Sequence, residues 1–267
     1  MRILPAGSAM ESRQEGRIQG SFRVCCRSDR DKALKPISIK GFQGTSLLDF
    51  PGRVASLVFT GGCNLTCPYC HNGGLVLDPE GYPDIPVDEL LADLKARKNF
   101  IDGVVISGGE PTIAAGLPAF LTELKRLDLQ VKIDTNGLLP DVIAALLKGR
   151  LVDYVSVDIK TSPRRYSELH TVAVDTSGLA QTVELLRTVA IDVEYRTTCI
   201  PGLVTPQEID EIGEMVRGAP LWVLQQYVAA HAMFEQWQQL EPYSRETILE
   251  LAGQAEKYAN VVQTRGI

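Results

Sequence analysis

The sequence predicts an α/β fold, a partial (β/α)6 barrel with an open parallel sheet. Hydrophobic residues make up 45% of the 267 residues and charged residues 22%, which supplies a core and excludes disordered, collagen-like and coiled-coil chains. From residue 54 onward, six short apolar or β-branched runs each precede turn residues and a stretch with helical periodicity. This alternation favours a parallel sheet, because parallel strands need long, right-handed crossovers. Six units are fewer than the eight of a closed barrel, so we expect an open barrel, with a doubly wound sheet as the alternative.

The predicted strands alternate with amphipathic helices along this whole region. We expect strands at 54–60, 103–107, 130–134, 154–158, 192–198 and 222–227. We expect helices at about 86–98, 117–127, 140–148, 177–190, 206–217 and 244–257. No change in composition interrupts residues 40–267, so we expect residues 37–267 to form one catalytic domain.

The first 36 residues differ in charge from the rest. They hold eight basic and four acidic residues, a net of +4, which leaves −10 for residues 37–267 within the total of −6. The segment lacks the apolar run of a secretory signal. We therefore expect a flexible basic extension, or the product of an early start codon with Met10 as another start. The acidic balance gives no reason to expect nucleic acid or an anionic membrane as a partner.

Six cysteines are too dilute in this chain for a disulfide scaffold, and no run of 18 apolar residues offers a membrane span. We expect a reducing, cytoplasmic compartment. Cys25 and Cys26 adjoin in the basic segment, and Cys199, which stands alone, is expected to be a small buried hydrophobic residue. The other three cysteines lie within eight residues of one another, so the chemistry is expected there.

The cluster Cys63, Cys67 and Cys70 directly follows the first predicted strand. Thiolates bind zinc and iron–sulfur clusters, and spacings of three and two residues let one short loop surround one metal centre. A structural zinc needs four ligands; the fourth would be His71 or the distant Cys199, because no second C-x2-C pair exists. A cubane cluster held by three cysteines instead leaves one iron open to a ligand from outside the chain.

The second predicted strand ends in Gly108, Gly109 and Glu110. Glycines let the backbone approach a ligand closely, and the carboxylate that follows can accept a hydrogen bond from an ammonium group. The same residues also occur in ordinary turns, so this motif gains weight only from its position.

Charged residues mark the ends of the next three predicted strands. Asp134 and Thr135 end the third, Asp158 and Lys160 the fourth, and Arg196 interrupts the apolar fifth. Each has a simpler reading as a turn, a solvated ion pair or a strand-edge arginine. A buried arginine, however, needs an anionic partner. Together these residues fall at the carboxyl ends of parallel strands, where α/β proteins place their ligand sites.

The C-x3-C-x2-C loop, with Tyr69 directly before the third cysteine, resembles the signature of the radical S-adenosylmethionine (SAM) superfamily. The resemblance implies a [4Fe-4S] cluster on Cys63, Cys67 and Cys70, with the open iron chelated by the amino and carboxylate groups of SAM. It further implies that Tyr69 lies near the adenine and that His71 is a neighbour of the cluster.

Two further motifs look like those of the glycyl-radical-enzyme activase branch, Asp134-Thr135-Asn136-Gly137 and Asp158-Ile159-Lys160. By this resemblance Gly108–Glu110 contacts the methionine amino group, and Asp134 and Asp158 lie by the cofactor carboxylate. A monovalent cation between these two carboxylates would offset their repulsion of the cofactor. Lys160 is expected to donate to the cofactor, with Thr135 and Arg196 completing the site.

Residues 41–52, together with Cys70-His71-Asn72, are similar to the N-terminus of anaerobic ribonucleoside-triphosphate reductase activating proteins and, in part, to pyruvate formate-lyase activating enzyme. The likeness covers about residues 40–230. Ser156 stands where the formate-lyase activases tend to carry methionine, a departure that concerns the partner and not the reaction.

The resemblance implies a reaction in which the reduced cluster passes one electron to SAM, giving methionine and a 5′-deoxyadenosyl radical. This radical then takes a hydrogen atom from a glycine of a partner enzyme, which we expect to be anaerobic ribonucleoside-triphosphate reductase. A flavodoxin- or ferredoxin-like protein is the expected electron donor. The alternatives are activation of pyruvate formate-lyase, radical chemistry on a small molecule, and a zinc-binding module without enzyme activity.

Overall fold

The computed structural model describes residues 37–170 and 173–267, and in this part of the chain one sheet of eight strands organises the fold. Its strand order follows the sequence, so the two edges are the first and the last strand. Strand β1 pairs antiparallel with β2, and all later pairs are parallel. The strands are β1 (Ile39–Ser46), β2 (Ala55–Thr60), β3 (Gly103–Gly108), β4 (Gln130–Thr135), β5 (Tyr154–Asp158), β6 (Asp192–Cys199), β7 (Trp222–Gln226) and β8 (Val262–Arg265).

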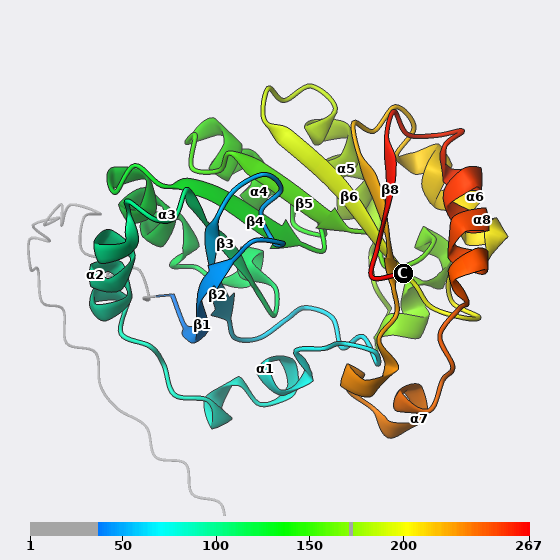
Figure 1. Ribbon diagram of the computed structural model, residues 1–267, viewed down its shortest axis with the longest axis horizontal. Helices are drawn as coiled ribbons and strands as arrows, with labels where there is room; N and C mark the ends of the chain where they lie inside the picture. The colour runs from blue at the N-terminus through cyan, green and yellow to red at the C-terminus, as the bar shows by residue number, and fades with distance from the viewer. Residues whose placement is uncertain (1–36, 171–172) are drawn as a thin grey trace, which may run out of the picture. The chain divides into compact units, whose positions relative to one another are not determined.

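This strand order decides between the two expected architectures. A doubly wound sheet reverses its strand order at one point, which sends helices to both faces. Here every crossover steps in the same direction, so right-handed connections place the long helices on one face (Figure 1). The predicted open, mostly parallel α/β sheet is confirmed.

Eight helices connect or follow these strands in the described ranges. They are α1 (Gly73–Leu77), α2 (Val87–Arg97), α3 (Leu117–Arg126), α4 (Pro140–Lys148), α5 (Ser177–Leu186), α6 (Pro206–Met215), α7 (Glu235–Gln238) and α8 (Arg245–Ala255). Sequence signals explain several starts: Pro140 and Pro206 occupy first turns, where no N–H is needed, and Ser244 caps α8 by accepting from Thr247 N. None of the helices described is both long and apolar enough to cross a membrane.

All six predicted strands are present, with ends within one residue of those expected, but the count of six was too low. Strand β1 escaped prediction because Gly41 and Gly44 interrupt its apolar pattern and two register shifts break its pairing with β2. Strand β8 escaped because it is a four-residue edge strand without buried residues. The fifth predicted helix was too long, since α5 ends at Leu186.

The two faces of the sheet differ in what they bury. On the outer face, which the long helices cover, Val104 and Ile106 of β3 belong to the main hydrophobic cluster together with Leu121 and Leu124 of α3. On the inner face, a second cluster of Phe50, Ala55, Leu57, Val105 and Tyr154 fills the space near the amino ends of the strands. At the carboxyl ends of the strands, the inner face is therefore not filled by this apolar cluster, and polar groups lie there.

Some expectations concern residues outside the described ranges. The basic segment 1–36, with Cys25 and Cys26, lies there, so the boundary at residue 36 stays a prediction.

Candidate active site

A cavity of about 210 Å³ at the carboxyl end of the sheet brings the predicted site residues together. Arg196 is not among the residues found to line it in the described chain, but it contacts two that do, Asp134 and Asp158. The other predicted residues all line the cavity: Cys63, Cys67, Tyr69, Cys70, His71, Gly108, Gly109, Glu110, Asp134, Thr135, Asp158 and Lys160.

The loop after β2 carries the three cysteines. Cys70 N–H donates to the Cys67 carbonyl oxygen at 2.9 Å, which closes a tight turn, and Leu65 N–H donates to Cys63 Sγ at 3.4 Å. Burial raises the pKa of Cys63 to about 12 and that of Cys67 to about 11. The thiols of the metal-free chain are therefore protonated near neutral pH, so a metal centre that binds them must displace protons.

The spacing of these thiols bears on the kind of metal. Across residues 37–170 and 173–267, no three His, Cys, Asp or Glu side chains are arranged to hold a single metal ion. In an iron–sulfur cubane each cysteine binds a different iron, so the thiols lie further apart than around one zinc ion.

Backbone of the loops after β2 and β3 is in direct contact, and only glycine fits there. Gly108 has a φ of +111°, and a Cβ on it would lie 2.4 Å from Thr60 N. A Cβ on Gly109 would lie 1.7 Å from the Gly62 carbonyl oxygen. Gly109 N–H donates to Thr60 O at 2.9 Å, so the two loops are joined as well as close.

The Glu110 carboxylate joins the loops after β3 and β4, and one of its partners reaches the cysteine loop. Its Oε1 accepts from Thr112 N at 3.0 Å, Thr112 Oγ1 at 2.5 Å and Thr135 Oγ1 at 2.7 Å, and its Oε2 accepts from Asn136 N at 2.7 Å. Asn136 in turn donates to Asn64 Oδ1 in the cysteine loop at 2.6 Å. Burial raises the pKa of Glu110, and these hydrogen bonds oppose that rise. Glu110 therefore fixes the cysteine loop relative to β3 and β4.

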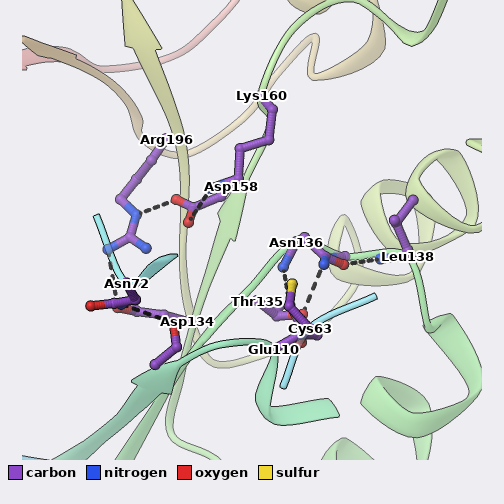
Figure 2. Close-up of polar contacts among 12 residues, drawn as sticks. Cys63, Asn72, Glu110, Asp134, Thr135, Asn136, Leu138, Asp158, Lys160 and Arg196 are labelled. Atoms are coloured by element: carbon purple, nitrogen blue, oxygen red, sulfur yellow. Dashed lines mark hydrogen bonds and ion pairs between the residues drawn. The ribbon is translucent and has the colours of Figure 1, made fainter. Parts of the chain in front are cut away.

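Arg196 lies between the two aspartates (Figure 2). Its Nε is 2.7 Å from Asp158 Oδ1, and its Nη1 is 3.3 Å from Asp134 Oδ2. Lys160 Nζ is 2.9 Å from the second oxygen of Asp158. The anionic partner expected for a buried arginine is thus this aspartate pair, which comes from β4 and β5.

These contacts keep Asp158, Lys160 and Arg196 charged. Burial alone would raise the pKa of Asp158, but Arg196 and Lys160 outweigh it and hold that pKa well below its usual range. Burial would likewise lower the pKa of Lys160, and the Asp158 carboxylate beside it raises that pKa above its usual value. Positive charge therefore persists beside the cavity at any ordinary pH.

Tyr69 and His71 pack against aromatic rings from the segment after β7. The Tyr69 ring lies 5.9 Å from that of Trp237, and the His71 ring lies 5.6 Å from that of His231 in an edge-to-face arrangement. The buried Tyr69 hydroxyl has no hydrogen-bond partner among the described residues. The segment between β7 and α8, in which the sequence predicts no element, thus covers one side of the cysteine loop.

Sequence reasoning missed three charged residues that continue the network. Lys132 Nζ lies 2.6 Å from Asp134 Oδ1 and 3.5 Å from Glu194 Oε1, and Arg265 Nη2 lies 2.6 Å from Glu194 Oε2. A signal was available for two of them: Lys132 stands two residues before Asp134, and Glu194 two residues before Arg196, so each pair shares one face of a buried strand.

The comparisons with known proteins agree with this site. A family profile described as the radical SAM superfamily matches residues 57–216, more than half of the chain. The chain belongs to the radical SAM superfamily. As a radical SAM enzyme, it belongs to a family that uses a [4Fe-4S] cluster and SAM.

Curated relatives narrow the likeness. A Methanocaldococcus jannaschii protein with the name "putative glycyl-radical enzyme activating enzyme" is 32% identical over 234 residues, 86% of this chain and 96% of its own. The pyruvate formate-lyase 1-activating enzyme of Escherichia coli K12 is 28% identical over 175 residues, 61% of this chain and 68% of its own. This radical SAM enzyme is therefore homologous to glycyl-radical enzyme activating enzymes.

Other similar proteins carry different names or share only the fold. A probable GTP 3′,8-cyclase of Methanococcus maripaludis is 34% identical over 122 residues, 44% of this chain and 40% of its own. The crystal structure of Streptococcus suis SuiB bound to the peptide SuiA has a TM-score of 0.60 at 16% identity and shares the fold alone. The match covers 79% of this chain but only about half, 48%, of SuiB.

Replacing Glu110 by glutamine tests its structural role. In Glu110→Gln, the side-chain NH2 group would face a hydrogen-bond donor that now donates to the carboxylate, and that hydrogen bond would be lost. We therefore expect the free energy of unfolding to fall by about 1–3 kcal/mol. Thermal unfolding should show a midpoint several degrees lower. Glu123→Gln, at an exposed ion pair with Arg126, is the matched control and should leave the midpoint unchanged. An unchanged midpoint for Glu110→Gln would contradict this role.

Proposed function

We propose that this chain is a glycyl-radical-enzyme activating enzyme that binds a [4Fe-4S] cluster on Cys63, Cys67 and Cys70 and SAM in the adjoining cavity. One observation carries the proposal: the three thiols line the same cavity as the Gly108-Gly109 backbone and the charged groups around Arg196. Homology to activating enzymes along most of the chain supports the choice of reaction.

The residues present fit these cofactors. Three thiols from one loop suit a cluster that keeps one iron open. Glu110 Oε1 accepts three hydrogen bonds but Oε2 accepts one, so Oε2 retains capacity for the methionine ammonium group. Lys160 Nζ has three donors and gives one to Asp158, which leaves two for an acidic or polar ligand.

When bound and reduced, the cluster would supply one electron to SAM, giving methionine and a 5′-deoxyadenosyl radical that takes a hydrogen atom from a glycine of the partner. The chain's own residues orient the cofactor and exclude water. A monovalent cation between Asp134 and Asp158 stays a prediction. Arg196 already contacts both aspartates and offsets the repulsion between carboxylates that suggested the cation. The electron must come from outside, and a flavodoxin- or ferredoxin-like donor in the cytoplasm stays the expected source.

Anaerobic ribonucleoside-triphosphate reductase is the partner that we propose, on the resemblance of residues 41–52 and Cys70-His71-Asn72. Pyruvate formate-lyase is the second candidate, supported by the Escherichia coli relative. Radical chemistry on a small molecule is the third, because the Methanococcus protein named a probable GTP 3′,8-cyclase is 34% identical to this chain over 122 residues.

Cys67→Ala tests the ligand assignment. Loss of one of three ligands should remove the cluster, so iron content and the visible absorbance of the anaerobically reconstituted protein should fall to background. Cys199→Ala is the matched control, because Cys199 is equally buried but does not line the cavity. An iron content of Cys67→Ala equal to that of the unaltered protein would refute the assignment.

Electron paramagnetic resonance tests the partner. The reconstituted enzyme, SAM and a reductant are mixed with anaerobic ribonucleoside-triphosphate reductase from the same genome, and we expect the doublet of a glycyl radical on the reductase. The reductase with its glycine changed to alanine should give no doublet. A doublet on pyruvate formate-lyase alone would reassign the partner, and none on either protein would contradict activation of both.

A further inference from the structure

A continuous chain of alternating charges crosses the inner face of the sheet and reaches the cavity. Each link is an ion pair of 2.6–3.5 Å, and the links join strands β4, β5, β6 and β8. In order, its members are Arg265, Glu194, Lys132, Asp134, Arg196, Asp158 and Lys160. The last four lie at the proposed SAM site, and the first three have no role assigned above.

The middle of this charge chain is sealed from water. The side chains of Lys132 and Glu194 are both 0% exposed. Below them, the Tyr154 ring centre lies 5.5 Å from Lys132 Nζ and belongs to the apolar cluster that also contains Phe50. A charge that deep is tolerated only when it is paired, so each member depends on its neighbours.

The charge chain fixes Asp134 from two sides. Lys132 holds Asp134 Oδ1 at 2.6 Å, while Arg196 holds Oδ2 at 3.3 Å. Lys132 is itself shared with Glu194, and Glu194 is held from the far side by both terminal nitrogens of Arg265, at 2.6 and 3.5 Å. Without Arg265, Glu194 would keep Lys132 as its cationic partner and would draw that ammonium away from Asp134.

The charge count suits an anionic ligand. The chain has four cations and three anions, a net of +1 beside a cavity that two of its aspartates line. The Glu110 carboxylate, which also lines the cavity, balances this +1, so a carboxylate of the ligand would meet a site that is neutral overall although three carboxylates line it. Loss of Lys132 or Arg265 would leave a net negative charge there, which disfavours an anionic ligand.

We propose that Lys132, Glu194 and Arg265 are positioning residues for SAM, and that the C-terminal strand β8 completes the cofactor site through Arg265. The inference rests on the proposed function, since it takes SAM to be the ligand of this cavity. None of the three residues lines the cavity in the described chain, so they act through Asp134 and Arg196.

The test compares SAM binding by the cluster-loaded protein and its variants. Arg265→Gln and Lys132→Met should each weaken the binding of SAM about tenfold or more, measured as Kd by anaerobic equilibrium dialysis. They should also diminish the change that SAM causes in the electron paramagnetic resonance spectrum of the reduced cluster, which a loss of stability alone would not alter. Arg265→Lys keeps the charge but loses the two-pronged contact, so it should recover part of the affinity.

Matched controls remove ion pairs outside the network. Lys125→Met breaks the pair with Asp153, of 2.7 Å, and Arg217→Gln breaks the exposed pair with Glu214. Both should keep the Kd and the spectral change of the unaltered protein. If Lys132→Met fails to fold, Arg265→Gln alone decides the test. Arg265 is 30% exposed on an edge strand, so the side chain at position 265 can be hydrated when it no longer pairs with Glu194, and the variant is expected to fold.

The outcomes separate the two proposals. If the unaltered protein binds SAM and Arg265→Gln binds it equally well with the same spectral change, this inference is overturned while the proposed function stands. If the unaltered protein carries its cluster but binds no SAM, the proposed function is overturned, and the inference falls with it.

Discussion

The site depends on the guanidinium of Arg196, which lies between Asp134 and Asp158. Two carboxylates that face one cavity repel each other, and burial would drive one of them to take up a proton. With Nε 2.7 Å from Asp158 and Nη1 3.3 Å from Asp134, Arg196 offsets this repulsion and joins β4, β5 and β6 at their carboxyl ends. Removing one member of such a buried network typically costs about 3–5 kcal/mol, because the remaining charges are left unpaired.

A second constraint ties the cysteine loop to this charged group. The loops after β2 and β3 touch through Gly108 and Gly109, and Glu110 binds the loops after β3 and β4 and, through Asn136, reaches Asn64. The three thiols are therefore held at a fixed position relative to the aspartates.

Much of this site could be predicted from the sequence, because the carboxyl ends of parallel strands must meet at one edge of a sheet. That rule placed Gly108, Asp134 and Asp158 correctly without knowledge of any contact. It could not choose the partner of Arg196 between the cofactor carboxylate and the acidic residues of the neighbouring strands, nor find the Lys132–Glu194 pair, since these depend on the register between strands about 60 residues apart. Arg265 was hidden for another reason: its strand is short, polar and at an edge, so no pattern marked it.

The central claim, that this chain uses its three cysteines and the adjoining cavity to cleave SAM, is tested most directly by product analysis. The anaerobically reconstituted protein is incubated with SAM and dithionite, and the mixture is separated by liquid chromatography. We predict 5′-deoxyadenosine and methionine in equal amounts, formed only when both the cluster and the reductant are present. Absence of 5′-deoxyadenosine from a protein with an intact, reducible cluster and bound SAM would contradict the account.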